Sequence, residues 1–233
     1  MIITIDGPAG AGKSTVARAL AEAIGFEYLN TGAMYRALAW VGLQRQIDWT
    51  DSDAIGRLGQ DLRLRIDGPR TFWETTDVTD AVRTPEVTAV THYTADHPGL
   101  RRILAQFQRQ YAEGRNVVTE GRDQGTFVFP DAVCKIYLTA TPQERTRRRI
   151  GEMIRRGELT PDQTTSVFDE ILAKIVARDR GDETRMVAPL RKAEDAVELM
   201  TDGMSIDQVV HELVRIVRRR SYEDATRRRR RPL

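Results

Sequence analysis

The hydrophobic positions of this chain fall into two patterns, short apolar runs and longer stretches with helical spacing. The short runs are almost wholly apolar, as expected of strands buried on both faces of a parallel sheet. They cover residues 2–5, 27–29, 116–119, 132–138 and 196–200. Helical spacing or helix-start signals predict helices over residues 16–23, 33–43, 51–62, 85–95 and 98–112, from Pro142, from Pro161 towards Arg180, and over 206–217. Strands that alternate with helices indicate an α/β protein with a parallel sheet flanked by helices.

One segment breaks this pattern and predicts a small antiparallel unit inside the α/β core. Apolar and charged residues alternate over residues 62–67, and Gly68-Pro69 follows as a turn. Two further short runs, residues 71–74 and 77–79, complete the unit. We therefore predict a single domain over 1–223, with core segments 1–61, 114–140 and 186–220 and an insertion at about 62–97. Residues 224–233 form a basic tail that we expect to be disordered.

The composition is that of a soluble globular protein. The chain has 233 residues, of which 40% are hydrophobic and 30% charged, and a net charge of +2. No apolar run approaches the roughly 20 residues of a membrane helix, and the N-terminus has no signal-like stretch. Its one cysteine, Cys134, lies in an apolar run, so we expect a buried strand residue rather than a nucleophile. These features predict a cytoplasmic protein.

A complete phosphate-binding motif follows the first apolar run. It reads Gly7-Pro8-Ala9-Gly10-Ala11-Gly12-Lys13-Ser14 and leads into a helix-forming stretch. Backbone N–H groups of such a turn converge on phosphate, aided by the positive end of the following helix. Lys13 can reach the β- and γ-phosphates, and the Ser14 hydroxyl can bind Mg²⁺. The sequence therefore predicts a site for a nucleoside triphosphate.

The arginines suggest a second anionic substrate. They cluster at residues 145–149, 178–185 and 227–231, and guanidinium groups suit phosphate oxygens. The last cluster reads either as a solvated end or as a weak contact for RNA; the small net charge otherwise gives no reason to expect nucleic acid. The chain lacks the Asn/Thr-Lys-x-Asp motif of GTPases and is short for a helicase, so a small-molecule kinase is favoured.

Several motifs together resemble the bacterial cytidylate kinase family. They are Gly7–Ser14, Thr31–Arg36, Asp77–Thr79, Val82–Val87, Gly121–Asp131 and Val187–Leu190. The matches keep their order from the first strand to about Leu190, and only the arginine tail falls outside the resemblance. The resemblance implies a P-loop NTPase-type fold with an inserted NMP-binding subdomain. It also implies transfer of the γ-phosphoryl group from ATP to CMP or dCMP.

The same resemblance implies roles for individual residues. ATP would be bound by Gly7, Pro8, Ala9, Gly10, Ala11, Gly12, Lys13, Ser14, Thr15 and Arg145. CMP would be bound by Thr31, Tyr35, Arg36, His92, Arg101, Arg122, Asp123, Arg178, Asp182 and Arg185. Lys13, Arg148, Arg149 and Arg178 would act in catalysis, and Ser14 and Glu120 would hold Mg²⁺. Residues 142–160 would form a lid that closes over ATP and excludes water.

Two positions depart from the family pattern. His92 stands where the family commonly has a serine near the cytosine, which leaves discrimination of CMP from UMP open. Glu120 stands where many members have aspartate; it keeps the charge, so we expect activity to survive.

The alternatives to a cytidylate kinase are a kinase for UMP, AMP or shikimate, a non-catalytic ATP-dependent switch, and an RNA-associated protein that relies on its tail. The AMP and shikimate alternatives leave the insertion unexplained, and a switch would need no second arginine-rich pocket. We expect a monomer.

Overall fold

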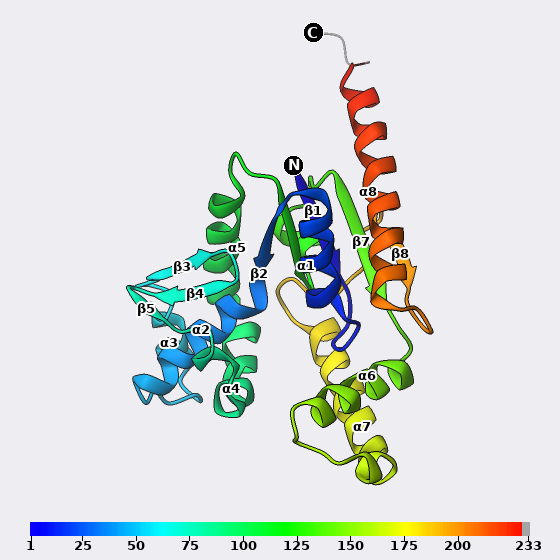
Figure 1. The fold of residues 1–233 in the computed structure, drawn as a ribbon. Helices are drawn as coiled ribbons and strands as arrows, with labels where there is room; N and C mark the ends of the chain where they lie inside the picture. Colours follow the sequence, from blue (N-terminus) through cyan, green and yellow to red (C-terminus); the bar gives the residue numbers. More distant parts are fainter. Residues whose placement is uncertain (230–233) are drawn as a thin grey trace.

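The computed structural model describes residues 1–229, with side chains described to residue 226. Its centre is a parallel sheet of five strands in the order β2-β6-β1-β7-β8 (Figure 1). The strands are β1 (Ile2–Asp6), β2 (Glu27–Asn30), β6 (Val117–Gly121), β7 (Cys134–Thr139) and β8 (Val197–Met200). The predicted parallel α/β class is confirmed, because each short apolar run supplies one strand of this sheet.

Two helices cover one face of the sheet. Helix α1 (Lys13–Ile24) and helix α8 (Ile206–Arg229) pack together against β1, β6 and β7, as Figure 1 shows on the right of the molecule. Ile3 and Ile5 of β1 point into this core and are fully buried, as is Leu213 of α8. Cys134 is buried here too, which confirms its predicted strand position.

A second core lies on the side of β2. It joins Leu29 to α2 (Thr31–Gln44), α3 (Ser52–Arg57), α5 (Pro98–Ala112) and the insertion. The insertion contains the predicted antiparallel sheet, with β3 (Leu64–Asp67), β4 (Arg70–Trp73) and β5 (Thr76–Asp77) in sequential order. A 3-10 turn, η1 (Ala81–Arg83), then leads into α4 (Pro85–Asp96), which packs on α2.

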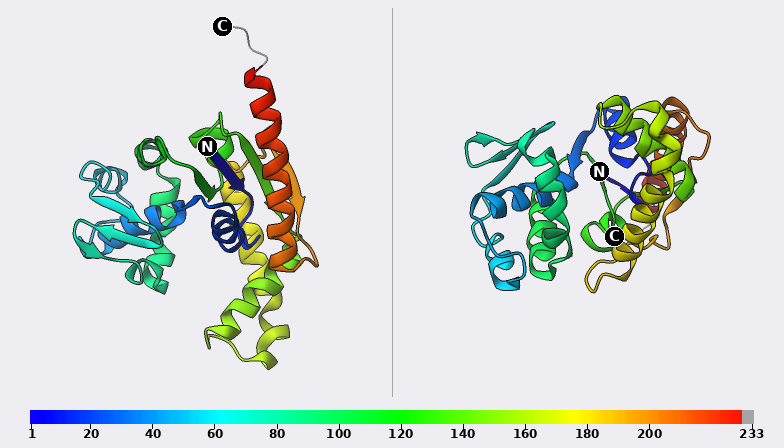
Figure 2. Two further views of the ribbon diagram at one scale, coloured as in Figure 1. Left: turned by 45° about the horizontal axis from the view of Figure 1, so that its top comes forward. Right: turned by 90° about the horizontal axis from the view of Figure 1, so that it is seen from below.

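Two helices form a separate hairpin below the carboxyl ends of the strands in Figure 1. They are α6 (Pro142–Arg155) and α7 (Thr164–Thr184), joined by the short turn η3 (Pro161–Gln163). A small apolar cluster around Ile150, Ile171 and Ile175 holds the two helices together. Figure 2 shows that this hairpin and the insertion lie on different sides of the sheet. The site described below lies between these two parts.

Two predicted boundaries were wrong. The helix expected over 51–62 ends at Arg57, because Gly56 and Gly59 weaken it. The last helix does not stop at 217 but continues to Arg229, so residues 224–229 are helical rather than a disordered tail. Ion pairs of Glu223 with Arg219 and Arg220, one helical turn away, support this extension. The rest of the expected tail, residues 230–233, lies outside the described residues.

Within residues 1–229 no helix has both the length and the apolar character needed to span a bilayer.

Candidate phosphoryl-transfer site

The phosphate loop connects the end of β1 to the start of α1. Gly7 has φ of 149°, and a Cβ there would lie 1.9 Å from the backbone oxygen of Leu138, so only glycine fits. Gly12 has φ of 86° and directly precedes α1. The Lys13 Nζ donates to Pro8 O at 2.7 Å across the loop. Burial, followed by the nearby Arg122, lowers the pKa of Lys13 to about 7. An anionic ligand in the loop would therefore stabilise the charged form of the Lys13 amino group.

The two residues expected to hold a metal lie in contact. Ser14 Oγ donates to Glu120 Oε1 at 2.9 Å, which joins the start of α1 to β6. Thr31 Oγ1 donates to the backbone oxygen of Glu120 at 2.7 Å and so fixes the backbone of the residue that carries this carboxylate. No group of three or more possible metal-binding side chains occurs in the described part of the chain. One hydroxyl and one carboxylate suit Mg²⁺, which is usually held by one or two protein oxygens together with substrate phosphates.

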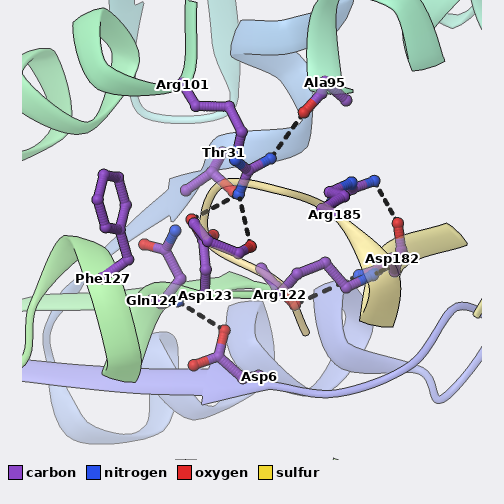
Figure 3. Close-up of polar contacts among 12 residues, drawn as sticks. Asp6, Thr31, Ala95, Arg101, Arg122, Asp123, Gln124, Phe127, Asp182 and Arg185 are labelled. Carbon is purple, nitrogen blue, oxygen red and sulfur yellow. Dashed lines mark hydrogen bonds and ion pairs between the residues drawn. The ribbon is translucent and has the colours of Figure 1, made fainter. Parts of the chain in front are cut away.

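Four arginines gather around one buried carboxylate, that of Asp182 on α7. Arg122 Nε donates to Asp182 Oδ2 at 2.6 Å, and Arg185 donates to Asp182 Oδ1 (Figure 3). Although burial opposes it, Arg122 and Arg185 hold the pKa of Asp182 below its ordinary value. Arg178 and Arg36 face the same group of charges. Desolvation lowers the pKa of both, and neighbouring arginines lower it further.

This cluster has more positive than negative charge, because four arginines face two carboxylates, Asp182 and Asp96, the latter paired with Arg185 Nε at 2.6 Å. Among the described residues, Arg178 has no hydrogen bond or ion pair, and Arg36 donates only to neutral oxygens, Thr88 Oγ1 at 2.7 Å and Val82 O at 3.5 Å. Unbalanced guanidinium groups repel one another, and a bound phosphate would relieve the repulsion. The predicted phosphate-binding arginines therefore do come together in space.

A second, deeper pair lies beside the arginine cluster. Arg101 on α5 donates to Asp123 Oδ2 at 2.5 Å, and both side chains are nearly inaccessible to solvent, at 3% and 6% exposure (Figure 3). Arg101 also donates to Ala95 O at 2.8 Å, while its Nε–H is buried without a partner among the described residues. The Tyr35 ring lies 5.6 Å from this guanidinium. An unpaired buried donor beside a carboxylate can recognise a ligand that has both an acceptor and a donor.

His92 lies on the exposed side of α4. Its ring contacts the neighbouring Tyr93 ring at 4.0 Å between centroids, and its Nδ1 lies 2.8 Å from Ala89 O on the same helix. The buried side of α4 instead presents Thr94, which donates to backbone oxygens including Tyr35 O. No contact joins His92 to Arg101 or Asp123, so its predicted role at the base stays a prediction.

The arginines of α6 differ in what they contact. Arg145 is buried and donates to Ala9 O at 2.8 Å and to Asp179 Oδ2 at 2.5 Å, while Asp179 Oδ1 accepts from Ala9 N at 3.1 Å. Arg145 therefore binds the tip of the phosphate loop. Arg148 Nη1 lies 3.3 Å from Ala11 O and also donates to Thr201. Arg149 pairs weakly with Glu152, at 3.4 Å, and is close enough to Arg36 to lower its pKa.

Sequence reasoning missed two buried acids of this site, Asp6 and Asp179. Asp6 ends β1 immediately before Gly7 and accepts hydrogen bonds from two backbone N–H groups, Gln124 N at 2.8 Å and Gly125 N at 2.7 Å. A lone aspartate at the carboxyl end of a buried parallel strand was a signal that could have revealed it. The contacts of Asp179 had no such signal, because they join segments 170 residues apart.

Comparison with known proteins agrees with this geometry. A family model described as cytidylate kinase matches residues 3–219. A cytidylate kinase of Rhodopirellula baltica is 47% identical over 218 residues, which make up 94% of this chain and 93% of that protein. A bifunctional pantoate ligase/cytidylate kinase of Synechococcus sp. (strain CC9311) is 46% identical over 96% of this chain, and the chain spans 45% of its length.

The chain also has matches among solved structures at low sequence identity. The shikimate kinase of Bacteroides thetaiotaomicron has a TM-score of 0.45 and 16% identity, with 94% of this chain and 98% of that chain covered. A likeness of this degree carries no argument about function. The family model and the relative from Rhodopirellula baltica, in contrast, each extend over nearly the whole chain. The chain therefore belongs to the cytidylate kinase family.

Proposed function

We propose that this protein transfers the γ-phosphoryl group of ATP to CMP or dCMP, giving ADP and the nucleoside diphosphate. The observation that carries the proposal is the arginine cluster around Asp182, of which Arg122 and Arg178 lie near enough to Lys13 of the phosphate loop to lower its pKa. Phosphoryl transfer needs in-line positioning and neutralisation of charge on the transferred group more than covalent chemistry. A phosphate loop that faces a group of guanidinium side chains can provide both.

On the donor side, the loop from Gly7 to Ser14 and the following Thr15 bind the ATP phosphates. Lys13 approaches the β- and γ-phosphates, and its amino group becomes fully protonated when these phosphates bind. Ser14 and Glu120 would hold Mg²⁺, which would screen the charge of the phosphates. Their contact at 2.9 Å supports this role, since a shared cation would replace the hydrogen bond between them.

On the acceptor side, the arginine cluster holds the CMP phosphate, and Asp182 accepts from the ribose hydroxyls. Arg101 and Asp123 face the cytosine. Asp123 accepts from the exocyclic amine, and the unpaired Nε–H of Arg101 is available for a base acceptor. Thr31, Tyr35 and His92 complete the acceptor pocket by the family resemblance. A base without an exocyclic amine, such as uracil, has no such donor for the Asp123 carboxylate. The pocket therefore favours CMP over UMP.

The proposed lid is residues 142–160, which comprise α6 and the segment that follows it. Arg148 and Arg149 neutralise charge on the transferred phosphoryl group when the lid closes over the bound ATP, and Arg145 contacts the phosphate loop. The insertion at about residues 62–97 is the proposed NMP-binding subdomain. We propose in addition that the protein acts in the cytoplasm as a monomer, which fits its free, buried Cys134.

A coupled assay of ADP formation tests the function. ATP and Mg²⁺ are supplied with CMP, dCMP, UMP or AMP in separate reactions. We expect rapid turnover with CMP and dCMP only. Arg178→Ala should lower turnover at least 100-fold, since it removes an unpaired guanidinium from the reacting phosphates. Arg180→Ala, which changes an exposed arginine two residues away, is the matched control. Equal turnover with UMP would contradict the assigned base recognition, and no turnover with any acceptor would refute the kinase.

A further inference from the structure

Asp6 is a buried acid that the proposed reaction does not use directly. It is 4% exposed and lies between the two loops that bind the substrates. On its own strand it immediately precedes Gly7, the first residue of the phosphate loop. In the sheet it pairs with Gly121, the last residue of β6, after which come Arg122 and Asp123. Asp6 thus joins, through its strand and its pairing with Gly121, the start of the phosphate loop to the start of the acceptor loop.

The carboxylate of Asp6 holds the acceptor loop by its backbone. Oδ1 accepts from Gln124 N at 2.8 Å, and Oδ2 accepts from Gly125 N at 2.7 Å. These are the first two residues of η2 (Gln124–Val128), a single π-helical turn that begins directly after Asp123. Figure 3 shows Asp6 on one side of this segment and Arg101 on the other. Asp123 is therefore fixed through its side chain by Arg101 and through the following backbone by Asp6.

We propose that Asp6 is a positioning residue that couples the phosphate loop to the acceptor loop and sets the place of Asp123 for recognition of the CMP base. The inference rests on the proposed function and adds to it a residue that touches neither substrate. Its two hydrogen bonds need both carboxylate oxygens as acceptors. A protonated carboxyl keeps one good acceptor oxygen, because its hydroxyl oxygen accepts only weakly, and an amide has one acceptor oxygen. Either change therefore weakens or removes one of the two hydrogen bonds to the acceptor loop.

The surroundings of Asp6 bring its titration into the working pH range. Burial raises the pKa of Asp6 to about 7, although the hydrogen bonds from the two backbone N–H groups act to lower it. The charged groups that face it are Lys13 on α1, which favours the carboxylate, and Asp123, which opposes it. From β7, the Lys135 stem lies against Gly125, but its ammonium is paired with Asp195. As pH falls below about 7, one of the two bonds to the acceptor loop is therefore lost.

The test is a comparison of Asp6→Asn with the native enzyme between pH 6 and pH 9. At pH 8 we expect the KM for CMP to rise about tenfold in the variant, because the variant loses one hydrogen bond to a charged group. The KM for ATP should change less than twofold. In the native enzyme the KM for CMP should rise as pH falls through 7, and the difference from the variant should shrink. Asp131→Asn, an exposed aspartate beyond η2, should follow the native profile.

A second measurement uses the native protein and does not depend on how the variant folds. Amide hydrogen exchange of Gln124 and Gly125, corrected for intrinsic rates, should lose protection about tenfold between pH 8 and pH 6. Unchanged protection, or equal rises in the KM for CMP and for ATP in Asp6→Asn, would overturn this inference alone. A native enzyme with no turnover of CMP would overturn the proposed function as well.

Discussion

Replacing Asp123 by alanine should destabilise the protein strongly, because it would leave the Arg101 guanidinium buried without its counter-charge. The two side chains are 3% and 6% exposed and 2.5 Å apart. Breaking such a buried pair typically costs about 3–5 kcal/mol. Arg101 keeps two backbone acceptors, Ala95 O at 2.8 Å and Ala188 O at 3.4 Å. We therefore expect a loss near the lower end, about 3 kcal/mol.

The assay is the free energy of unfolding from urea denaturation, followed by circular dichroism, for the native protein and Asp123→Ala. The matched control is Asp67→Ala, which breaks the exposed pair with Arg65, where exposure is 54% and 67%. Exposed pairs contribute about 0–1 kcal/mol, so the control should unfold almost as the native protein does. A loss under about 1 kcal/mol in Asp123→Ala, with an unchanged denaturant slope, would refute the argument that the pair is closed to water.

Three further predictions follow from single residues. Glu120→Gln should raise the Mg²⁺ concentration needed for half-maximal turnover several-fold without changing the KM for CMP; an unchanged Mg²⁺ requirement would remove Glu120 from the metal site. Cys134, whose pKa burial raises to about 12, should resist a thiol reagent at pH 8 until urea unfolds the chain, and rapid labelling of the folded protein would contradict its burial. Asp6 has a folded pKa of about 7 against 3.8 when unfolded, so the unfolded chain binds fewer protons between these values. The contribution of Asp6 to the free energy of unfolding should therefore fall as pH rises from about 4 to 7, and Asp6→Asn should remove that part of the pH dependence measured by urea denaturation.

Local patterns in the sequence were sufficient to predict most elements. The short apolar runs became the five strands, and α5 has the predicted bounds, Pro98–Ala112, because proline at its first position and a strong apolar face mark it clearly. The alternating residues 62–67 likewise gave β3. Boundaries failed where competing local effects decide them, such as the glycines within and just after α3 and the ion pairs that prolong α8.

The site was predicted less completely, because its contacts join distant segments. The motif identified Lys13 and Ser14, and the structure brings Ser14 into contact with Glu120, while the metal site itself stays a prediction. The family resemblance assigns Arg145 to ATP; the structure shows its guanidinium bonded to Ala9 and Asp179, and its contact with ATP stays a prediction. Helical spacing specifies which side chains share a face but not which partner that face meets.

The hydrogen bonds of Arg145 and Asp179 with the backbone of Ala9 have a consequence for the thermodynamics of nucleotide binding. Both backbone groups of Ala9 are already satisfied, so the loop is preorganised and little conformational entropy should be lost when ATP enters. Because Arg145 is on α6 and Asp179 on α7, any rotation of this hairpin as a rigid body must either carry the loop with it or break these bonds. A change in the hairpin position should therefore change the affinity for ATP, and binding of ATP should shift the equilibrium between hairpin positions by the same free energy.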